Sequence, residues 1–301
     1  MNELNFSRRN FLKVSTSAAG GFMLGFHIPT SLASQEMDGG GFEINAFLSI
    51  DTDGIVSIVT PQTDMGQGAR TSIAMMVAEE LDVPWENVRS IWADPHRHVN
   101  NDKAYTTTGT GGSRTVAGRH PYLMQAGASA RERLRVAAAE SWAVALSSVV
   151  AKQGKLTSGD NSGTYGEFAE AASKVSLAEE PAIKEYGDWW LVGGEVPRVD
   201  VPEKSNGSAI YPMDIDLPGM VFAATASCPV PEGKLVSFDF DAVKNMPGVI
   251  SAVQLSQVTE APSFRSMRDG VAVVADSWYL AKNALDAMPV EWDYGRGVNI
   301  S

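Results

Sequence analysis

Two glycine-rich segments, each placed between a strand pattern and a helix pattern, constrain the fold of this chain most. Residues 62–68 (QTDMGQG) follow an apolar strand pattern at 55–60 and precede a helix predicted over 71–81 by the spacing of apolar residues. Residues 105–114 (YTTTGTGGSR) precede a long alanine-rich helix predicted over 121–147. Because strands and helices alternate around these loops, we predict an α+β fold, a mixed α/β arrangement.

Both loops have the composition of an anion-binding site. Glycines let a backbone approach a ligand closely, and the amides at a helix N-terminus favour negative charge. A glutamine in the first loop can both donate and accept, and the second loop adds hydroxyls and a cation. The predicted ligand-binding residues are Gly66, Gln67, Gly68, Gly111, Gly112, Ser113 and Arg114. One phosphate-bearing ligand shared by both loops is one interpretation, and two solvated surface turns are the other.

The remaining patterns divide the chain into three parts, with boundaries at 33/34 and 204/205. In the second part we predict strands at 45–50 and 88–93 and a short helix at 165–173. The third part is predicted to contain five strands and two helices. The strands are expected at 221–226, 236–240, 249–255, 271–275 and 290–293, and the helices at 241–245 and 277–287, with Ser277 as N-cap.

The first 33 residues have the pattern of a twin-arginine export signal. Arg8 and Arg9 precede Phe-Leu-Lys and a short apolar run, which is too short and too rich in glycine to span a bilayer comfortably. Small residues end the run, so we expect cleavage after Ala33. This route exports folded proteins, typically those that receive a cofactor in the cytoplasm. The signal predicts a periplasmic protein, and a retained signal would tether it to the membrane.

Composition excludes some classes of protein. A hydrophobic content of 44% and a charged content of 20% suit a globular chain with a substantial core. The net charge of −12 argues against a nucleic-acid partner. The single cysteine, Cys228, permits no intrachain disulfide and cannot hold an iron–sulfur cluster, which normally takes four cysteines. Electrons from any redox chemistry would therefore leave to another subunit, and we expect Cys228 to be a small buried residue.

Other polar residues give weaker signals. Asp94, His96 and His98 are spaced like metal ligands, but no further ligand follows at useful spacing, so we assign no metal site. No Ser-His-Asp arrangement and no phosphate-binding lysine loop is present in the sequence. The Trp189–Trp190 pair is expected to serve packing or an interface.

Four segments resemble parts of the xanthine dehydrogenase/aldehyde oxidase family. Residues 61–88 (PQTDMGQGARTSIAMMVAEELDVPWENV) resemble its molybdopterin-binding segment, and 106–116 (TTTGTGGSRTV) resembles the next cofactor loop. Residues 207–253 and 271–295 resemble its α/β hammerhead domain. An export signal, then a cofactor loop, then the hammerhead is the order found in large subunits of the isoquinoline 1-oxidoreductase group and their periplasmic relatives.

The resemblance implies a function and a division into domains. Residues 34–204 would be the N-terminal part of a molybdopterin-binding domain, and 205–301 the hammerhead domain. The family hydroxylates aldehydes or N-heterocycles with oxygen from water, so the substrate would be a small molecule. The cofactor would be molybdopterin, in bacterial relatives often as its cytosine dinucleotide. The partner that receives electrons would be a small [2Fe–2S] iron–sulfur subunit.

The resemblance has one gap. The family's catalytic glutamate lies in a glycine-rich motif that this sequence does not show, and neither Glu195 nor Glu291 fits it. No catalytic residue is therefore assigned. We expect the chain to be the N-terminal part of a molybdenum subunit, or one half of a split subunit, inactive without the remainder. The alternatives are a non-catalytic exported docking or assembly subunit and, less consistent with the signal, a periplasmic small-molecule-binding protein.

Overall fold

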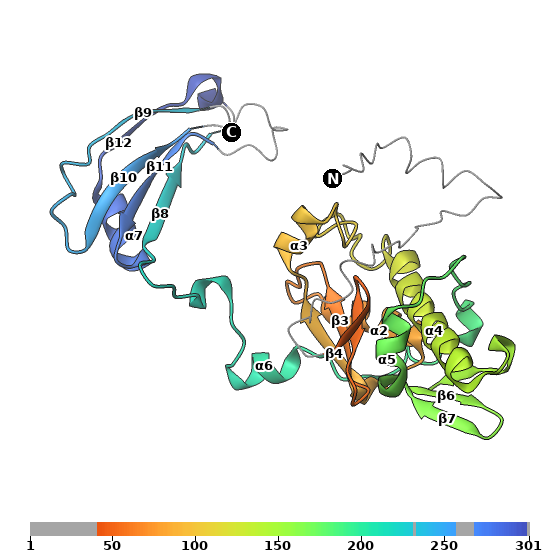
Figure 1. Cartoon of the computed structure of the whole chain (residues 1–301). Helices are drawn as coiled ribbons and strands as arrows, with labels where there is room; N and C mark the ends of the chain where they lie inside the picture. The colour runs from red at the N-terminus through yellow and green to blue at the C-terminus, as the bar shows by residue number, and fades with distance from the viewer. Residues whose placement is uncertain (1–40, 231–232, 257–267, 300–301) are drawn as a thin grey trace, which may run out of the picture. The chain divides into compact units, whose positions relative to one another are not determined.

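The computed structural model describes residues 41–230, 233–256 and 268–299 (Figure 1). The chain forms two compact units, unit 1 up to Ala209 and unit 2 from Ile210. The expected export signal, with Arg8 and Arg9, lies outside the described residues. The boundary expected at 204/205 falls inside helix α6 (Val201–Asn206), and the chain divides just after that helix.

Unit 1 is built on a four-stranded sheet in the order β1-β2-β3-β4. Its strands are β1 (Phe42–Asn45), β2 (Leu48–Ile50), β3 (Val56–Thr60) and β4 (Val88–Trp92). The first three pair antiparallel, whereas β3 and β4 pair parallel, as a crossover through a helix requires. The single strand expected at 45–50 is wrong. The Asn45 side chain accepts a hydrogen bond from Phe47 N at 2.9 Å and turns the chain between β1 and β2.

Two long helices pack against each other and form the other layer of unit 1 (Figure 1). They are α2 (Ala69–Leu81) and α4 (His120–Trp142). A Cβ built on Gly127 of α4 would lie 2.3 Å from the Val77 carbonyl oxygen, so glycine permits this close crossing. The helix predicted to continue to 147 stops at Trp142, because Ala143 adopts a left-handed conformation and caps it.

The rest of unit 1 consists of short elements. Helix α3 (Pro95–Asn100) lies in a segment whose sequence shows no apolar periodicity, and α5 (Tyr165–Ser173) begins and ends where the sequence predicts. A second sheet, in the order β5-β6-β7, was not predicted. Its strands are β5 (Val150–Lys152), β6 (Lys155–Ser158) and β7 (Asn161–Thr164). Gln153 and Gly154, both with positive φ, form the tight turn between β5 and β6.

The core of unit 1 lies between the four-stranded sheet and the helices. Fully buried side chains come from β1 to β3, from β6, from α2, α4 and α5, and from the segments beside these elements. The largest are Tyr105, Tyr165, Phe47, Ile44, Leu48, Ile50, Ile58, Ile73, Leu81, Leu123, Met124 and Leu134. Alanines fill much of α4 because its crossing with α2 leaves room only for small side chains.

Unit 2 is a smaller α+β body. Its strands are β8 (Phe222–Ser227), β9 (Lys234–Phe238), β10 (Val249–Leu255), β11 (Gly270–Ala275) and β12 (Val290–Asp293). They form a three-stranded sheet, β10-β11-β8, and a two-stranded sheet, β12-β9, all antiparallel. Helix α7 (Trp278–Ala287) packs on β8 and β11, and its predicted cap is confirmed: Ser277 accepts from Leu280 N at 3.3 Å.

Two further expectations for unit 2 have clear outcomes. The helix expected at 241–245 is wrong. That segment forms consecutive hydrogen-bonded turns and no helix, because Pro247 and Gly248 follow too closely for a helix to propagate. The expectation for Cys228 is confirmed, since its side chain is fully buried.

Together the two units confirm the predicted α+β class. Of the helices that the structure describes, none is both long enough and apolar enough to cross a bilayer.

Candidate functional site

The first glycine-rich loop connects β3 to the N-terminus of α2. Gly66 and Gly68 have φ of 99° and 80°, a region that other residues rarely adopt, and Gly68 is the residue that caps α2. Gly66 and Gln67 are exposed, and nothing lies within 4 Å of a Cβ built on Gly66. The loop thus presents backbone and an amide side chain to solvent at the start of a 13-residue helix.

Several amides of this loop already have acceptors, which the sequence did not indicate. Asp64 accepts from Gly66 N at 2.7 Å and from Arg70 N at 2.9 Å. Gln67 Oε1 accepts from Met65 N at 2.5 Å, and Gln67 Nε2 donates to the Thr63 carbonyl at 3.2 Å. A carboxylate of the loop itself therefore occupies part of the position where we expected a ligand anion.

The second glycine-rich loop follows α3 and leads to the N-terminus of α4. Its predicted ligand-binding residues, Gly111, Gly112, Ser113 and Arg114, are all exposed. Gly112 and Ser113 have φ of 60° and 56°. At the start of the loop Tyr105 is buried, and it donates its backbone N–H to His98 Nδ1 at 3.3 Å. Tyr105 therefore fixes one end of the loop in the core.

The structure brings the two loops together. Gln62 Nε2 donates to the Thr107 carbonyl oxygen at 2.6 Å, and Thr110 Oγ1 donates to the Thr63 carbonyl oxygen at 3.2 Å. The Thr63 carbonyl also accepts from Gln67, so one atom links the side chains of both loops. In the described part of the chain, the hydrogen bonds between the loops do not join Gly66–Gly68 directly to Gly111–Arg114.

Beneath the second loop lies a buried polar cluster that the sequence did not reveal, formed by Gln62, Arg119 and Tyr122. Gln62 is 0% exposed and Arg119 is 7% exposed. Arg119 Nη2 donates to the Gly109 carbonyl at 2.7 Å, whereas its Nε and Nη1, and Gln62 Oε1, have no hydrogen-bond partner. Burial raises the pKa of the Tyr122 hydroxyl, and nearby Thr106, Arg119 and Gln62 oppose this shift.

A segment distant in sequence also contacts the first loop. Arg198 Nη1 donates to the Gly66 carbonyl at 3.3 Å, and its guanidinium pairs with Asp200 at 2.8 Å. Hydrogen bonding to Arg198 holds the pKa of the Asp200 carboxyl well below its usual range, against the opposing effect of burial. No local pattern in the sequence points to Arg198, because its contact with the loop spans 132 residues.

Arg70 attaches the N-terminus of α2 to strand β4 and to helix α6. Its guanidinium donates to Ser90 of β4 and pairs with Glu203 of α6 at 2.6 Å. It also lies over the Trp92 ring, 4.8 Å from the centroid. Because these contacts fix the start of α2, the loop before it has a defined position.

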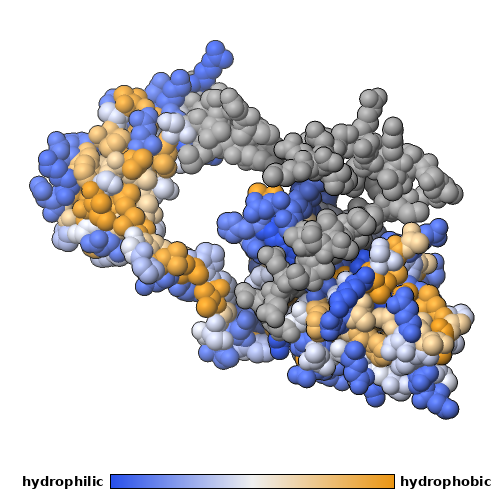
Figure 2. Space-filling view, in the orientation of Figure 1, coloured by the Kyte–Doolittle hydropathy of each residue, from blue (hydrophilic) through white to orange (hydrophobic). Residues whose placement is uncertain are grey.

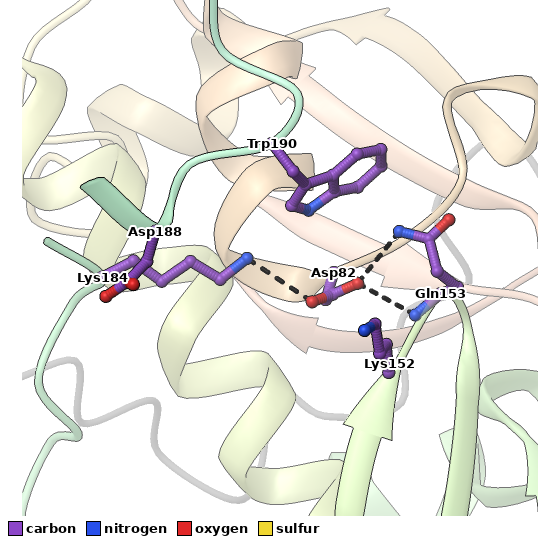
Figure 3. A pocket seen from close by; sticks show the side chains of 6 residues that line it. All are labelled: Asp82, Lys152, Gln153, Lys184, Asp188 and Trp190. Atoms are coloured by element: carbon purple, nitrogen blue, oxygen red, sulfur yellow. Dashed lines mark hydrogen bonds and ion pairs between the residues drawn. The ribbon is translucent and has the colours of Figure 1, made fainter. Parts of the chain in front are cut away.

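Two of the surface hollows that the described residues form lie on unit 1. One, of about 400 Å³, lies near the C-terminus of α2 and is lined by Asp82, Lys152, Gln153, Lys184, Asp188 and Trp190 (Figure 3). Its charges are mixed, and Asp82 already accepts from Gln153 N at 2.9 Å.

The other hollow, of about 430 Å³, is largely apolar. It is lined by Ser72, Met75, Met76, Val116, Ala117, His120, Trp189, Val192 and Gly193. It therefore borders the residues that follow each glycine-rich loop.

The residues spaced like metal ligands have a structural role instead. Asp94 caps α3 by accepting from His96 N at 2.8 Å, and His98 stacks on Tyr105 at 6.0 Å. Within the described ranges, no three or more His, Cys, Asp or Glu side chains are grouped to hold a metal ion. Trp189 contacts Tyr186 edge to face at 5.1 Å, in keeping with the packing role expected for the tryptophan pair.

Comparison with known proteins gives three informative relatives. The chain is 31% identical over 82% of its length to the beta subunit of isoquinoline 1-oxidoreductase from Brevundimonas diminuta. It is 29% identical over 99% of its length to a membrane-bound aldehyde dehydrogenase [pyrroloquinoline-quinone] of Gluconacetobacter polyoxogenes. It is 28% identical over 83% of its length to a subunit of nicotinate dehydrogenase from Pseudomonas putida.

These relatives are much longer than the aligned region. The matches cover 35%, 39% and 20% of their respective lengths. Residues 15–215, which include both glycine-rich loops and the buried polar cluster, match the family described as the molybdopterin cofactor-binding domain. Because that match spans well over half of the sequence, the chain belongs to the molybdopterin cofactor-binding domain family.

Proposed function

We propose that this chain is the cofactor-binding part of a periplasmic molybdenum hydroxylase that oxidises an N-heterocycle or an aldehyde with oxygen from water. The family supports the cofactor, and the names of the relatives support the substrate classes: isoquinoline and nicotinate are N-heterocycles, and the third is an aldehyde dehydrogenase. Electrons would pass to a separate [2Fe–2S] subunit, since a single cysteine cannot hold a cluster here.

The observation that carries this proposal is the joining of the two glycine-rich loops through the Thr63 and Thr107 carbonyl oxygens. Side by side, the loops offer an exposed glutamine amide, a serine hydroxyl and an arginine, which are Gln67, Ser113 and Arg114. Buried atoms without partners, Gln62 Oε1 and Arg119 Nε and Nη1, lie just beneath. This set of donors and acceptors fits a pterin that carries a phosphate or, in its cytosine dinucleotide form, a pyrophosphate.

Three side chains of the loops have distinct parts in this proposal. Gln67 already bonds Met65 and Thr63, so it would use its second amide hydrogen and its second oxygen lone pair at the edge of the pterin. Its amide is exposed, and its loop is fixed by Arg70 and Arg198. Ser113 and Arg114 would bind phosphate oxygens. When bound, the molybdenum cofactor supplies the oxidation chemistry, accepting two electrons from the substrate. We assign no catalytic base to this chain.

Unit 2 is proposed to be the hammerhead domain that the sequence resembles. The family match ends at residue 215, so this assignment is supported by the sequence resemblance and by an α+β body of five strands and one main helix among the described residues. Hydrophobic residues gather over the visible face of unit 2 (Figure 2). Its exposed strand residues include Val236, Ile250 and Val253. We propose that the remainder of the molybdenum subunit packs on such surface.

The proposed function is tested by the cofactor content of the purified, complete assembly. Molybdenum would be measured by elemental analysis, and pterin by the fluorescence of an oxidised extract. We expect Gln67→Ala to lower both by roughly twofold to tenfold, the effect of losing one or two hydrogen bonds. The matched control is Gln153→Ala, which removes an exposed amide at the other end of α2 and should change neither.

Two outcomes would contradict this proposal. Complexes of wild-type protein that contain pyrroloquinoline quinone in place of molybdenum and pterin would assign the chain to a different chemistry, the one named for one relative. Equal molybdenum and pterin contents in wild-type and Gln67→Ala complexes would remove the first loop from the site. The unfolding midpoint of each variant shows whether the fold is retained.

The proposed location is tested separately by the two arginines near the N-terminus. Replacing Arg8 and Arg9 by lysine keeps the charge but removes the twin-arginine motif. We expect the double variant to remain in the cytoplasmic fraction, whereas a variant with Lys13→Arg, which leaves the pair intact, should be exported. Periplasmic recovery of the double variant would refute the export route.

A further inference from the structure

Arg119 is a buried cation without a counter-charge. It is 7% exposed, and its Nη2 donates to the neutral carbonyl of Gly109 at 2.7 Å. Its Nε and Nη1 have no partner, and no ion pair with a carboxylate is found for it in the described parts of the chain. Burying a charge in this way is costly unless a charged or strongly polar group meets it.

The surroundings of Arg119 increase the positive potential. Arg119 is the N-cap residue of α4, a helix of 23 residues whose first turn carries no acidic side chain and no side-chain cap. The positive end of the helix dipole therefore adds to the guanidinium charge. Arg114, exposed in the same loop, is a third source of positive charge. All three lie at one end of α4, so they would act on the same ligand.

The part of the loop above Arg119 is rich in glycine. It reaches the guanidinium through a glycine carbonyl, and Gly109, Gly111 and Gly112 lie within four residues of each other. Glycine changes backbone conformation without a steric penalty. A stronger acceptor than a carbonyl, such as a phosphate oxygen, would therefore replace Gly109 at Nη2 and also use Nε, which lies beside it on the guanidinium.

We propose that Arg119 and the N-terminus of α4 form an anion subsite beneath the second loop, which takes a phosphate or pyrophosphate group when the Gly109 carbonyl moves away. The subsite rests on the proposed function, since it would hold the acidic end of the cofactor whose pterin contacts Gln67. Gln62, fully buried and bonded to the Thr107 carbonyl, fixes the loop from its other side and is a positioning residue.

The test uses the full chain with inorganic phosphate and inorganic pyrophosphate as probes, in calorimetric titrations. We expect Arg119→Met to weaken pyrophosphate binding at least tenfold and Arg119→Lys to weaken it less, because lysine keeps the charge but loses the bidentate geometry. The matched control is Arg133→Met. Arg133 is also 7% exposed and bonds to the carbonyls of Ile44 and Val175, so its removal should leave affinity unchanged.

A second readout is thermal unfolding with and without pyrophosphate. Pyrophosphate should raise the unfolding midpoint of wild-type protein and of Arg133→Met, and should not raise that of Arg119→Met. If Arg119→Met fails to fold, the comparison of Arg119→Lys with wild type decides.

Two results of the binding measurements would overturn the subsite: no binding of either probe by wild-type protein, or the same affinity in wild type and Arg119→Met. Internal water would then be the partner of the guanidinium. Failure of the proposed function gives a different pattern, in which Arg119-dependent pyrophosphate binding persists but the complete assembly contains neither molybdenum nor pterin. Conversely, full cofactor content in an assembly that carries Arg119→Met would support the proposed function and contradict the subsite.

Discussion

Gly127 illustrates how one residue position governs the packing of unit 1. It lies where α4 crosses α2, and a Cβ there would lie 2.3 Å from the Val77 carbonyl oxygen and 2.8 Å from Glu80 Cβ. Alanine is a better helix former than glycine by about 1 kcal/mol, so an unpacked helix would gain stability from the exchange. Here the clash is with a backbone atom, which cannot turn away as a flexible side chain can.

We therefore predict that Gly127→Ala lowers the free energy of unfolding, with overpacking of about 1–3 kcal/mol exceeding the gain in helix propensity. Urea unfolding of the full chain, followed by circular dichroism, measures the change. The control is Gly187→Ala, at an exposed glycine with nothing within 4 Å of the built Cβ and an ordinary φ, which should be nearly neutral. An increase in stability of Gly127→Ala would show that the helices separate at this crossing without cost.

At the scale of elements, the irregular segment 181–200 is held on α2 by buried carboxylates. Glu79 Oε2 accepts from the backbone of Trp190, Leu191 and Val192, at 2.6–3.1 Å. Lys184 Nζ pairs with Glu79 Oε1 at 2.9 Å. The far end of the segment carries Arg198 to the first glycine-rich loop. The position of the first glycine-rich loop therefore depends on the attachment of segment 181–200 to α2.

The two adjacent carboxylates respond to pH in opposite directions. Burial alone would raise the pKa of Glu79, but hydrogen bonds from Lys184 and from the backbone of Leu191 and Val192 bring that pKa below its usual value. For Glu80, burial is dominant and raises the pKa. Ionised Glu79 thus stabilises the fold above the pKa of the unfolded chain, near 4.5, and loses this contribution as pH falls toward its lower folded value.

We predict that Glu79→Gln destabilises the chain by about 1.5–3 kcal/mol at pH 7, since hydrogen bonds to a charged group are lost. Because wild-type Glu79 becomes protonated in acid, the difference between wild type and variant should shrink from pH 7 to pH 3. Urea unfolding at a series of pH values measures it. The control is Glu86→Gln, at an exposed glutamate, with little effect expected. A difference that stays constant with pH would show that the pKa of Glu79 is the same in the folded and the unfolded chain.

At the scale of the whole molecule, the two units have separate hydrophobic cores. Among the described residues of unit 2, the hydrophobic core cluster contains nine buried residues from β8, β11, α7 and the segments beside them. These are Ala224, Val243, Val271, Val273, Ala275, Ala281, Ala284, Leu285 and Met288. Because each unit buries its own core, each should be stable by itself.

We predict that residues 210–301, expressed alone, unfold in a cooperative transition, as do residues 1–209. In the full chain, Val273→Asp places a charge at a position that is 0% exposed in unit 2. This variant should abolish the unit 2 transition and leave the transition of unit 1 unchanged, measured by hydrogen exchange. Simultaneous loss of protection in both units would show that they fold as one body.

Local patterns in the sequence determined much of the fold. Strands 249–255 and 290–293 and helix 165–173 have the bounds that the sequence predicts, because apolar periodicity and capping residues act within a few neighbours. The hairpins β5 to β7 were missed, since their short strands are largely polar and show little alternation. Their tight turn at Gln153–Gly154 was the available signal.

The candidate site shows the same division. The sequence by itself determined which two loops are rich in glycine and where they meet helices, because composition and periodicity are local properties. Only the tertiary structure decided that Thr63 and Thr107 join the loops, that Asp64 accepts from the amides of the first loop, and that Arg119 is buried without a counter-charge. Burial and pairing of polar groups depend on residues brought together from distant parts of the chain, and sequence spacing does not record such contacts.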